Sequence, residues 1–363
     1  MTLSNLATPV FYIAAFCTIL FLGYIAHKKQ KRFLSVILVF LPAIIVALRF
    51  QTGSDTENYK DIYDSLNASS FDSAISQFFS LSFEPYTILS ARLSGLLGFG
   101  YFFYFLAHSL LAFAACFYAS KKIDHDRWWL IYTAVSIIMI PYCLNVMRQA
   151  LATSLFLLLL ILLAEERKNW PLILSLFALM AFCHFSSIML LPVLFLYPLA
   201  KTKKFESRFV TVFVAIIASL VVFPFVFSFA SRNALLPPKY LEAIGVSKFN
   251  LLNFDFVIFL AIATFLFITR KFKNSYDKNH NQYITFIILC NLFYAGIGFF
   301  SAYIGRMSDY FWPIAVIGIW FAIDRFKDSF KLKSVVYLGL IVLYFVLSSV
   351  VLGNNQIIPY GVM

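Results

Sequence analysis

The chain consists largely of apolar runs, most of them nearly long enough to cross a lipid bilayer as a helix. Such a helix needs roughly 20 apolar residues to span about 30 Å of hydrocarbon. Hydrophobic residues make up 61% of the 363 residues and charged residues only 13%, whereas soluble domains hold about half and about a quarter. No soluble core would bury this much Phe, Leu and Ile, so the excess must face lipid. We therefore predict an all-α polytopic membrane protein, with residues 1–363 forming one transmembrane domain.

Twelve runs, some of them short, are predicted to span the membrane. They lie near residues 9–26, 33–48, 100–119, 128–144, 149–164, 170–183, 185–200, 209–229, 252–269, 283–300, 310–325 and 334–351.

Basic residues concentrate in every second connection between these runs. Six short connections hold 21 of the 29 Lys and Arg residues: 27–32, 121–127, 165–169, 201–208, 270–278 and 324–333. Because cytoplasmic loops carry such an excess, we expect these six to be cytoplasmic and both termini to lie outside. The net charge of +12 then reflects topology and attraction to anionic lipid head groups. This placement argues against nucleic-acid binding.

Two outer connections are long enough to carry a function, at residues 49–99 and 231–250. In the first, Ser54-x-x-Glu57 has the spacing of a capping box. Two apolar stripes at helical spacing predict short helices in the outer interface; they comprise Tyr59, Ile62, Tyr63 and Leu66, then Phe71, Ile75, Phe78 and Phe79. The run from Pro85 to Phe99 contains a charge and two glycines, which favours a tilted or re-entrant helix.

Three arginines, Arg49, Arg148 and Arg306, fall at the predicted outer ends of apolar runs. A charge at membrane depth costs about 2.5–3.5 kcal/mol on insertion scales, so such residues normally face a cavity and a partner. One arginine alone is equally well explained by reaching back to the interface. Three together favour an anionic head group, because the guanidinium fork suits phosphate.

Two further polar features lie inside apolar stretches. Asn145, Arg148, Gln149 and Ala152 are spaced to share one helical face, which predicts a substrate-lining face or, alternatively, a hydrogen-bonded patch between helices. His184 separates two apolar runs, of which the first is short, so we predict a recessed polar tip in a cavity open to the outside. The alternative is a histidine that bonds a backbone carbonyl.

The outer acidic candidates are Asp55, Glu57, Glu84 and Asp309. A carboxylate near an arginine stays ionised at neutral pH and accepts a proton from an attacking hydroxyl. Glu57 is also explained as part of a helix cap, and Asp309 as a partner of Arg306. No acidic, His or Cys residues show zinc or calcium spacing, so we expect no metal and no cofactor.

Taken in order, these segments resemble the EpsG-like branch of the Wzy family of O-antigen and exopolysaccharide polymerases. The resemblance covers roughly residues 40–320 and rests on five segments: Leu48–Tyr59 with Gly-Ser-Asp-Thr, Phe83–Tyr86, Asn145–Ala152, Phe182–Ser187, and Arg306-x-x-x-Tyr310. The family pattern often has Tyr directly after Asp, whereas here Thr56 follows Asp55 and leaves the aromatic contact to Tyr59.

The resemblance implies a C-type glycosyltransferase architecture with a membrane-embedded site and no required metal. It implies polymerisation of undecaprenyl-pyrophosphate-linked repeat units on the outer face of the bacterial cytoplasmic membrane, for O-antigen, capsule or exopolysaccharide. The growing glycan passes to the non-reducing sugar of another unit and undecaprenyl pyrophosphate leaves. A chain-length regulator is an optional partner.

We expect Arg148, Arg306 and Arg49 to stabilise the leaving pyrophosphate, and Asp55, then His184 or Glu84, to act as the base in an inverting displacement. Tyr59, Asn145, Gln149 and Tyr310 are the predicted substrate contacts. The alternatives are a flippase for lipid-linked sugar, an O-antigen ligase and a membrane acyltransferase. The last would rest on His184, for which the neighbouring sequence offers no acidic partner.

Overall fold

The computed structural model describes the chain in several continuous stretches. These are residues 7–49, 52–70, 83–165, 169–191, 254–269, 306–324 and 329–353, with the short pieces 72–73, 76, 284, 287–291, 326, 357–358 and 360. The chain divides into two compact units, Met1–Ile188 with Asp328–Met363, and Met189–Lys327.

Five helices among the described residues are long and apolar enough to cross a membrane. They are α1 (Ala7–Lys29), α6 (Gly100–Ile123), α7 (Trp128–Asn145), α8 (Met147–Ala164), and α17 (Phe330–Phe345) with its continuation η4 (Val346–Val351). All belong to the first unit. The shorter apolar helices α2 (Arg32–Ala47) and α9 (Trp170–Cys183) join them there. The protein is therefore helical and multi-pass, as the apolar runs predict.

The predicted count of twelve spans is only partly matched. The expected run 209–229 and most of 185–200 and 283–300 lie outside the described residues. After α9 the chain first forms the 3₁₀ helix η1 (Phe185–Leu190). The C-type glycosyltransferase architecture stays a prediction.

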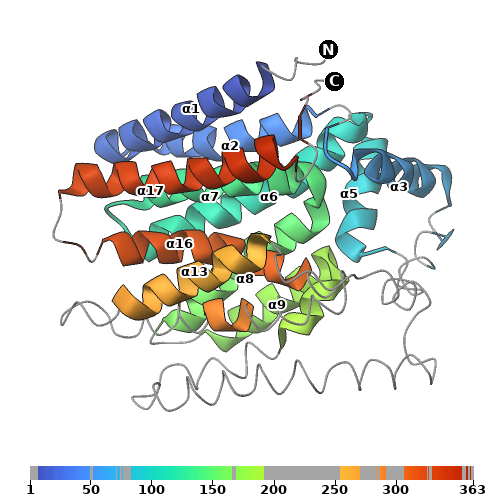
Figure 1. The fold of residues 1–363 in the computed structure, drawn as a ribbon. Helices are drawn as coiled ribbons and strands as arrows, with labels where there is room; N and C mark the ends of the chain where they lie inside the picture. The colour runs from blue at the N-terminus through green and yellow to red at the C-terminus, as the bar shows by residue number, and fades with distance from the viewer. Residues whose placement is uncertain are drawn as a thin grey trace. The chain divides into compact units, whose positions relative to one another are not determined.

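Within the first unit, the helices run between two ends (Figure 1). At one end, Lys122 in the last turn of α6 pairs with Glu165, which directly follows α8, at 3.1 Å. At the other end, the start of α1 and the end of α2 meet the C-terminal segment, since the Tyr360 N–H donates to Thr8 Oγ1 at 3.0 Å and the Tyr360 hydroxyl donates to the Ile45 carbonyl. Connections predicted for opposite sides of the membrane thus gather at opposite ends.

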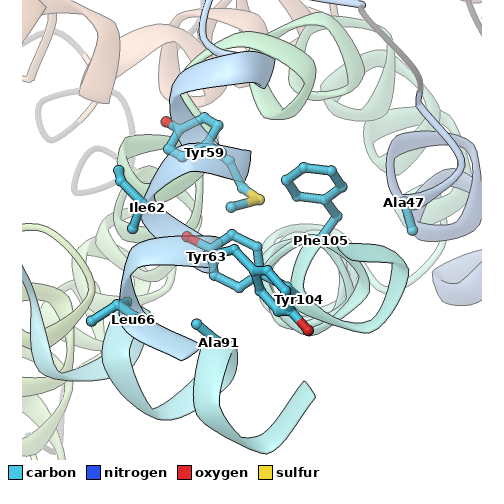
Figure 2. Close-up of a cluster of buried hydrophobic side chains, with 9 residues drawn as sticks. Ala47, Tyr59, Ile62, Tyr63, Leu66, Ala91, Tyr104 and Phe105 are labelled. Atoms are coloured by element: carbon cyan, nitrogen blue, oxygen red, sulfur yellow. The ribbon is translucent and has the colours of Figure 1, made fainter. Parts of the chain in front are cut away.

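Two short helices, α3 (Thr56–Ala68) and α5 (Pro85–Leu96), cover that second end. The predicted stripe on α3 is confirmed, because all four of its members are buried against α5 and α6. Figure 2 shows Tyr63 of α3 beside Tyr104 of α6, with their ring centroids 5.8 Å apart. Each such buried side chain stabilises the packing by about 1.5–3 kcal/mol. The second predicted stripe, at Phe71 to Phe79, falls on residues that are not described.

The predicted capping box is wrong. Asp55, not Ser54, is the N-cap residue of α3, and its side chain makes no capping hydrogen bond. The Ser54 hydroxyl instead reaches Asn145, while Glu57 pairs with Lys60 at 3.1 Å. A tertiary contact has displaced the local cap.

The second unit contains α13 (Phe254–Thr269), α16 (Trp312–Ile323) and the 3₁₀ helix η3 (Arg306–Phe311). The helices α13 and α16 pack together, with the Phe259 and Trp312 ring centroids 4.3 Å apart. A side chain at Gly318 would crowd Ile284 and Leu266, so the glycine permits this close packing.

Candidate functional site

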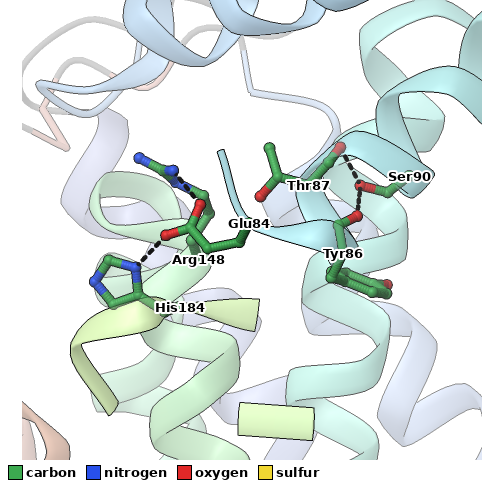
Figure 3. A network of polar contacts seen from close by, with 6 residues as sticks. All are labelled: Glu84, Tyr86, Thr87, Ser90, Arg148 and His184. Atoms are coloured by element: carbon green, nitrogen blue, oxygen red, sulfur yellow. Dashed lines mark hydrogen bonds and ion pairs between the residues drawn. The ribbon is translucent and has the colours of Figure 1, made fainter. Parts of the chain in front are cut away.

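Three charged or titratable side chains meet at the covered end of the first unit (Figure 3). Arg148 Nη1 donates to Glu84 Oε2 at 2.5 Å, and His184 Nδ1 lies 2.8 Å from Glu84 Oε1. The Glu84 side chain is 5% exposed, against 20% for Arg148 and 24% for His184. A buried carboxylate thus bridges an arginine and a histidine that are both still reachable.

Each member sits at a helix terminus. Glu84 is the N-cap residue of α5, followed by Pro85 in the first turn, a position that favours negative charge. His184 directly follows α9, with its N–H donating to the Met180 carbonyl at 2.9 Å. Arg148 lies in the first turn of α8. The ends of helices far apart in sequence therefore converge on one point.

The Glu84 carboxylate is ionised at neutral pH. Burial by itself raises its pKa, but the hydrogen bond from His184 and the charge of Arg148 outweigh burial and hold the pKa at about 2. An ionised carboxylate only accepts hydrogen bonds, so the proton of a neutral His184 belongs on Nδ1. The lone pair of His184 then lies on Nε2, which is the proton-accepting atom of the pair.

The polar face predicted for Asn145, Arg148, Gln149 and Ala152 is not one continuous face. Helix α7 ends at Asn145 and α8 begins at Met147, with Val146 between them at φ −108° and ψ 58°. The start of α7 and the end of α8 both lie near Lys122, so the chain reverses its direction between the two helices. Gln149 and Ala152 follow Arg148 on α8 and are buried, whereas Asn145 faces the loop before α3.

Arg49 clamps this reversal. Its Nη1 donates to the carbonyls of Cys143 and Leu144, at 2.9 and 2.6 Å, and its guanidinium carbon lies 4.0 Å from the centroid of the Phe105 ring. Arg49 is completely buried. These are carbonyls that a helix end leaves without partners, so the Arg49 side chain caps the last turn of α7 from outside the helix. Its predicted contact with a phosphate stays a prediction.

The loop after Arg49 is held against the same turn. Gly53 has φ 87°, and a Cβ at this position would overlap the Leu144 carbonyl. Only glycine combines this backbone conformation with such close approach. The Ser54 hydroxyl donates to Asn145 Oδ1, so the loop and the turn that precedes Arg148 form one structure.

Tyr59 lies between the two arginines. Its ring centroid is 5.5 Å from the guanidinium carbon of Arg49 and 5.6 Å from that of Arg148, within cation–π range. Burial raises its pKa, the nearby Asp55 carboxylate acts in the same direction, and both arginines oppose it. Asp55 itself is part-exposed at the start of α3, where it interacts electrostatically with Arg49 and Tyr59 and lies outside the Glu84 bridge.

Arg306 and Tyr310 belong to η3, in the second unit. Tyr310 is fully buried there. Their predicted participation in the site stays a prediction. Among the described residues, no group of three or more His, Cys, Asp and Glu side chains could hold a metal ion.

The contact between Glu84 and His184 was not predicted from the sequence. Both residues were singled out, yet they lie 100 positions apart, and no acidic residue near His184 in sequence marked it as half of a pair. The capping role of Arg49 was missed for the same reason. The sequence offers only a weaker signal for this contact. Glu84 precedes a proline at a predicted helix start and His184 follows a predicted helix end, and polar residues at such positions in an apolar chain need partners.

The model of the EpsG family matches residues 32–362. No curated protein and no solved structure matches the chain. The match covers every residue of the cluster described above and agrees with the resemblance noted in the sequence. The chain therefore belongs to the EpsG family.

Proposed function

We propose that this protein is a polysaccharide polymerase that joins undecaprenyl-pyrophosphate-linked repeat units on the outer face of the bacterial cytoplasmic membrane. Family membership supports the polymerase role. The observation that carries the chemistry is the buried bridge of Arg148, Glu84 and His184 at one end of a multi-pass helical unit. In this bridge, a cation that suits phosphate, Arg148, and a proton acceptor, His184, contact the two oxygens of the same carboxylate.

The reaction needs both groups. The acceptor hydroxyl attacks the anomeric carbon of the donor glycan, and its proton passes to a base as the new C–O bond forms. The old anomeric C–O bond breaks, and its electron pair leaves with the pyrophosphate. Direct displacement inverts the anomeric centre.

Arg148 stabilises the charge that grows on the leaving pyrophosphate. One fixed donor of this kind is worth about 2.7–4 kcal/mol, by analogy with oxyanion-hole deletions. The predicted phosphate contact of Arg306, which lies in the second unit, stays a prediction. Arg49 contributes chiefly by fixing the turn before Arg148, so its effect on the pyrophosphate is mainly indirect.

His184 is the proposed base, oriented by Glu84. A carboxylate that fixes the Nδ1 proton leaves Nε2 free to accept another, which is the arrangement used by many histidine bases. This reverses the order expected from the sequence, where Asp55 came first. Asp55 and Asn145, which are partly exposed, then serve as contacts to the sugars. Tyr59 and Gln149 are buried, so their predicted sugar contacts stay predictions.

Gene deletion with complementation tests the proposal. Loss of the polymer ladder on a gel, with single repeat units still attached to the surface, is the expected result. Wild type should restore the ladder and Arg148→Ala should not. Lys122→Gln, which breaks the exposed pair with Glu165 at the opposite end, is the matched control and should complement fully.

Two other outcomes point elsewhere. Disappearance of all surface glycan, with lipid-linked units trapped in the inner leaflet, would make the protein a flippase. An intact ladder of free lipid-linked polymer that never reaches its final acceptor would make it a ligase. Full complementation by Arg148→Ala would remove Arg148 from the mechanism.

A further inference from the structure

If the proposed function holds, the Arg148 guanidinium has two binding partners, Glu84 and the pyrophosphate of the donor. In the structure its Nη1 is bound to Glu84 at 2.5 Å. Its Nε has no hydrogen-bond partner among the described residues. A phosphate prefers two parallel N–H groups of one guanidinium. Because the Arg148 Nε is buried, a phosphate approaches the two terminal nitrogens, and Nη1 is the one that already binds Glu84. The pyrophosphate of the donor therefore competes with Glu84 for this cation.

Without a donor, the bridge is a poor proton acceptor. One Glu84 oxygen accepts a hydrogen bond from the Arg148 cation, and the other contacts His184 Nδ1. Charge sharing with Arg148 also lowers the negative potential that Glu84 exerts on His184. The unbound site thus holds its base in a weakened form.

Among the residues that the structure describes, no other cation contacts Glu84 to compensate its charge if Arg148 turns away. The remaining titratable groups that interact electrostatically with Glu84 are Tyr104 and His108 on α6 and Cys183 on α9. Tyr and Cys supply no positive charge. His108 is completely buried between the Tyr86 and Tyr104 rings, with Nδ1 3.0 Å from the Tyr104 carbonyl. Arg49 is committed to the α7 carbonyls.

We propose, on the basis of the function above, that donor binding draws Arg148 from Glu84 to the pyrophosphate and thereby switches the Glu84–His184 pair into an active base. When Glu84 loses its cation, the histidine hydrogen-bonded to it, His184, is the group that gains the compensating proton. In the reaction that proton comes from the acceptor hydroxyl: its O–H bond breaks, the C–O bond to the donor sugar forms, and the proton moves to His184 Nε2. The base is strong only when a leaving group is in place.

The proposal predicts that binding a pyrophosphate takes up a proton. The suitable probe is a dialkyl pyrophosphate, because a phosphodiester lacks the ionisation near pH 6 of a monoester. Its binding to the purified full chain in detergent is measured by calorimetry at pH 7.5, in two buffers that differ in ionisation enthalpy. The difference between the buffers counts the protons bound per ligand.

Wild type should take up a substantial fraction of a proton for each probe bound. Glu84→Gln should bind the probe roughly tenfold tighter or more, since Arg148 no longer leaves a carboxylate, and should show no uptake. His184→Gln should bind the probe and also show no uptake. Glu57→Gln, a matched change at an exposed carboxylate paired with Lys60, should keep the wild-type affinity and uptake.

The outcomes separate the switch from the polymerase. Probe binding by wild type without proton uptake, or weaker binding by folded Glu84→Gln, overturns the switch and leaves the polymerase standing. If Glu84→Gln does not fold, as judged by thermal unfolding, persistence of uptake in His184→Gln overturns the switch by itself. If no form of the protein binds the probe, the proposed leaving-group site is wrong.

Discussion

Replacing Arg49 by Met should destabilise the protein more than it impairs chemistry. The change removes the donor to two helix-terminal carbonyls, of Cys143 and Leu144, inside a fully buried environment. A hydrogen bond from a charged donor contributes about 1.5–3 kcal/mol, so the two together contribute about 3–6 kcal/mol. Burial lowers the pKa of Arg49 to about 10, so the group is charged at pH 7 and its desolvation offsets part of this gain. We expect a net loss of about 3 kcal/mol.

Thermal unfolding in detergent measures this effect. A thiol-reactive dye reports the transition, because Cys116, Cys143, Cys183 and Cys290 are buried in the folded chain. Arg49→Met should lower the midpoint clearly, and Arg49→Lys by less, since an ammonium keeps the charge but does not bridge two carbonyls while stacking on Phe105. Lys122→Gln, at an exposed pair, should change it little.

Polymer synthesis per folded molecule decides the interpretation. If Arg49 acts through the turn, Arg49→Lys should retain most of the wild-type synthesis at temperatures where it stays folded. An Arg49→Met protein with the wild-type midpoint and no synthesis would refute the clamp and return Arg49 to the leaving group.

Three further predictions concern Glu84, Gly53 and the topology of the chain. The pKa of Glu84 is depressed from 4.5 to about 2 in the folded state, so its contribution to stability, about 3 kcal/mol, is fully present above pH 4.5 and lost as the pH falls toward 2; the unfolding midpoints of wild type and Glu84→Gln should therefore converge between pH 6 and about pH 3, and a constant difference would contradict the assignment. Gly53→Ala should cost about 1–3 kcal/mol, because alanine is strained at φ 87° and meets the Leu144 carbonyl, and an unchanged midpoint would show that the loop moves freely. In a chain stripped of native cysteines, Asp64→Cys should react with an impermeant maleimide added to intact cells and His125→Cys only after lysis; the reverse pattern would invert the topology.

Much of the architecture follows from the sequence. The apolar runs determine helices, because in lipid the backbone must satisfy its own hydrogen bonds. The runs at 33–48 and 170–183 are observed as α2 (Arg32–Ala47) and α9 (Trp170–Cys183), each within a residue or two at both ends. The stripe on α3 follows from the helical period alone. The same physics marks Arg49, Glu84, Arg148 and His184 as residues that need partners.

The identity of those partners is decided by the tertiary structure. Arg148 is 64 positions from Glu84, and His184 is 100 positions from it. Asp55, Glu57 and Glu84 are each able to pair with an arginine, and spacing along the chain does not distinguish them. Packing does: α3 directs Glu57 to Lys60, while the ends of α5, α8 and α9 converge around Glu84.

Arg49 illustrates the same limit. The sequence determines that a charge follows an apolar helix and that its burial is costly without compensation. Only the fold shows that the end of α7 lies beside it, offering two carbonyls that have lost their helical partners. The need for compensation is local chemistry, whereas the group that supplies it depends on how helices distant in sequence pack together.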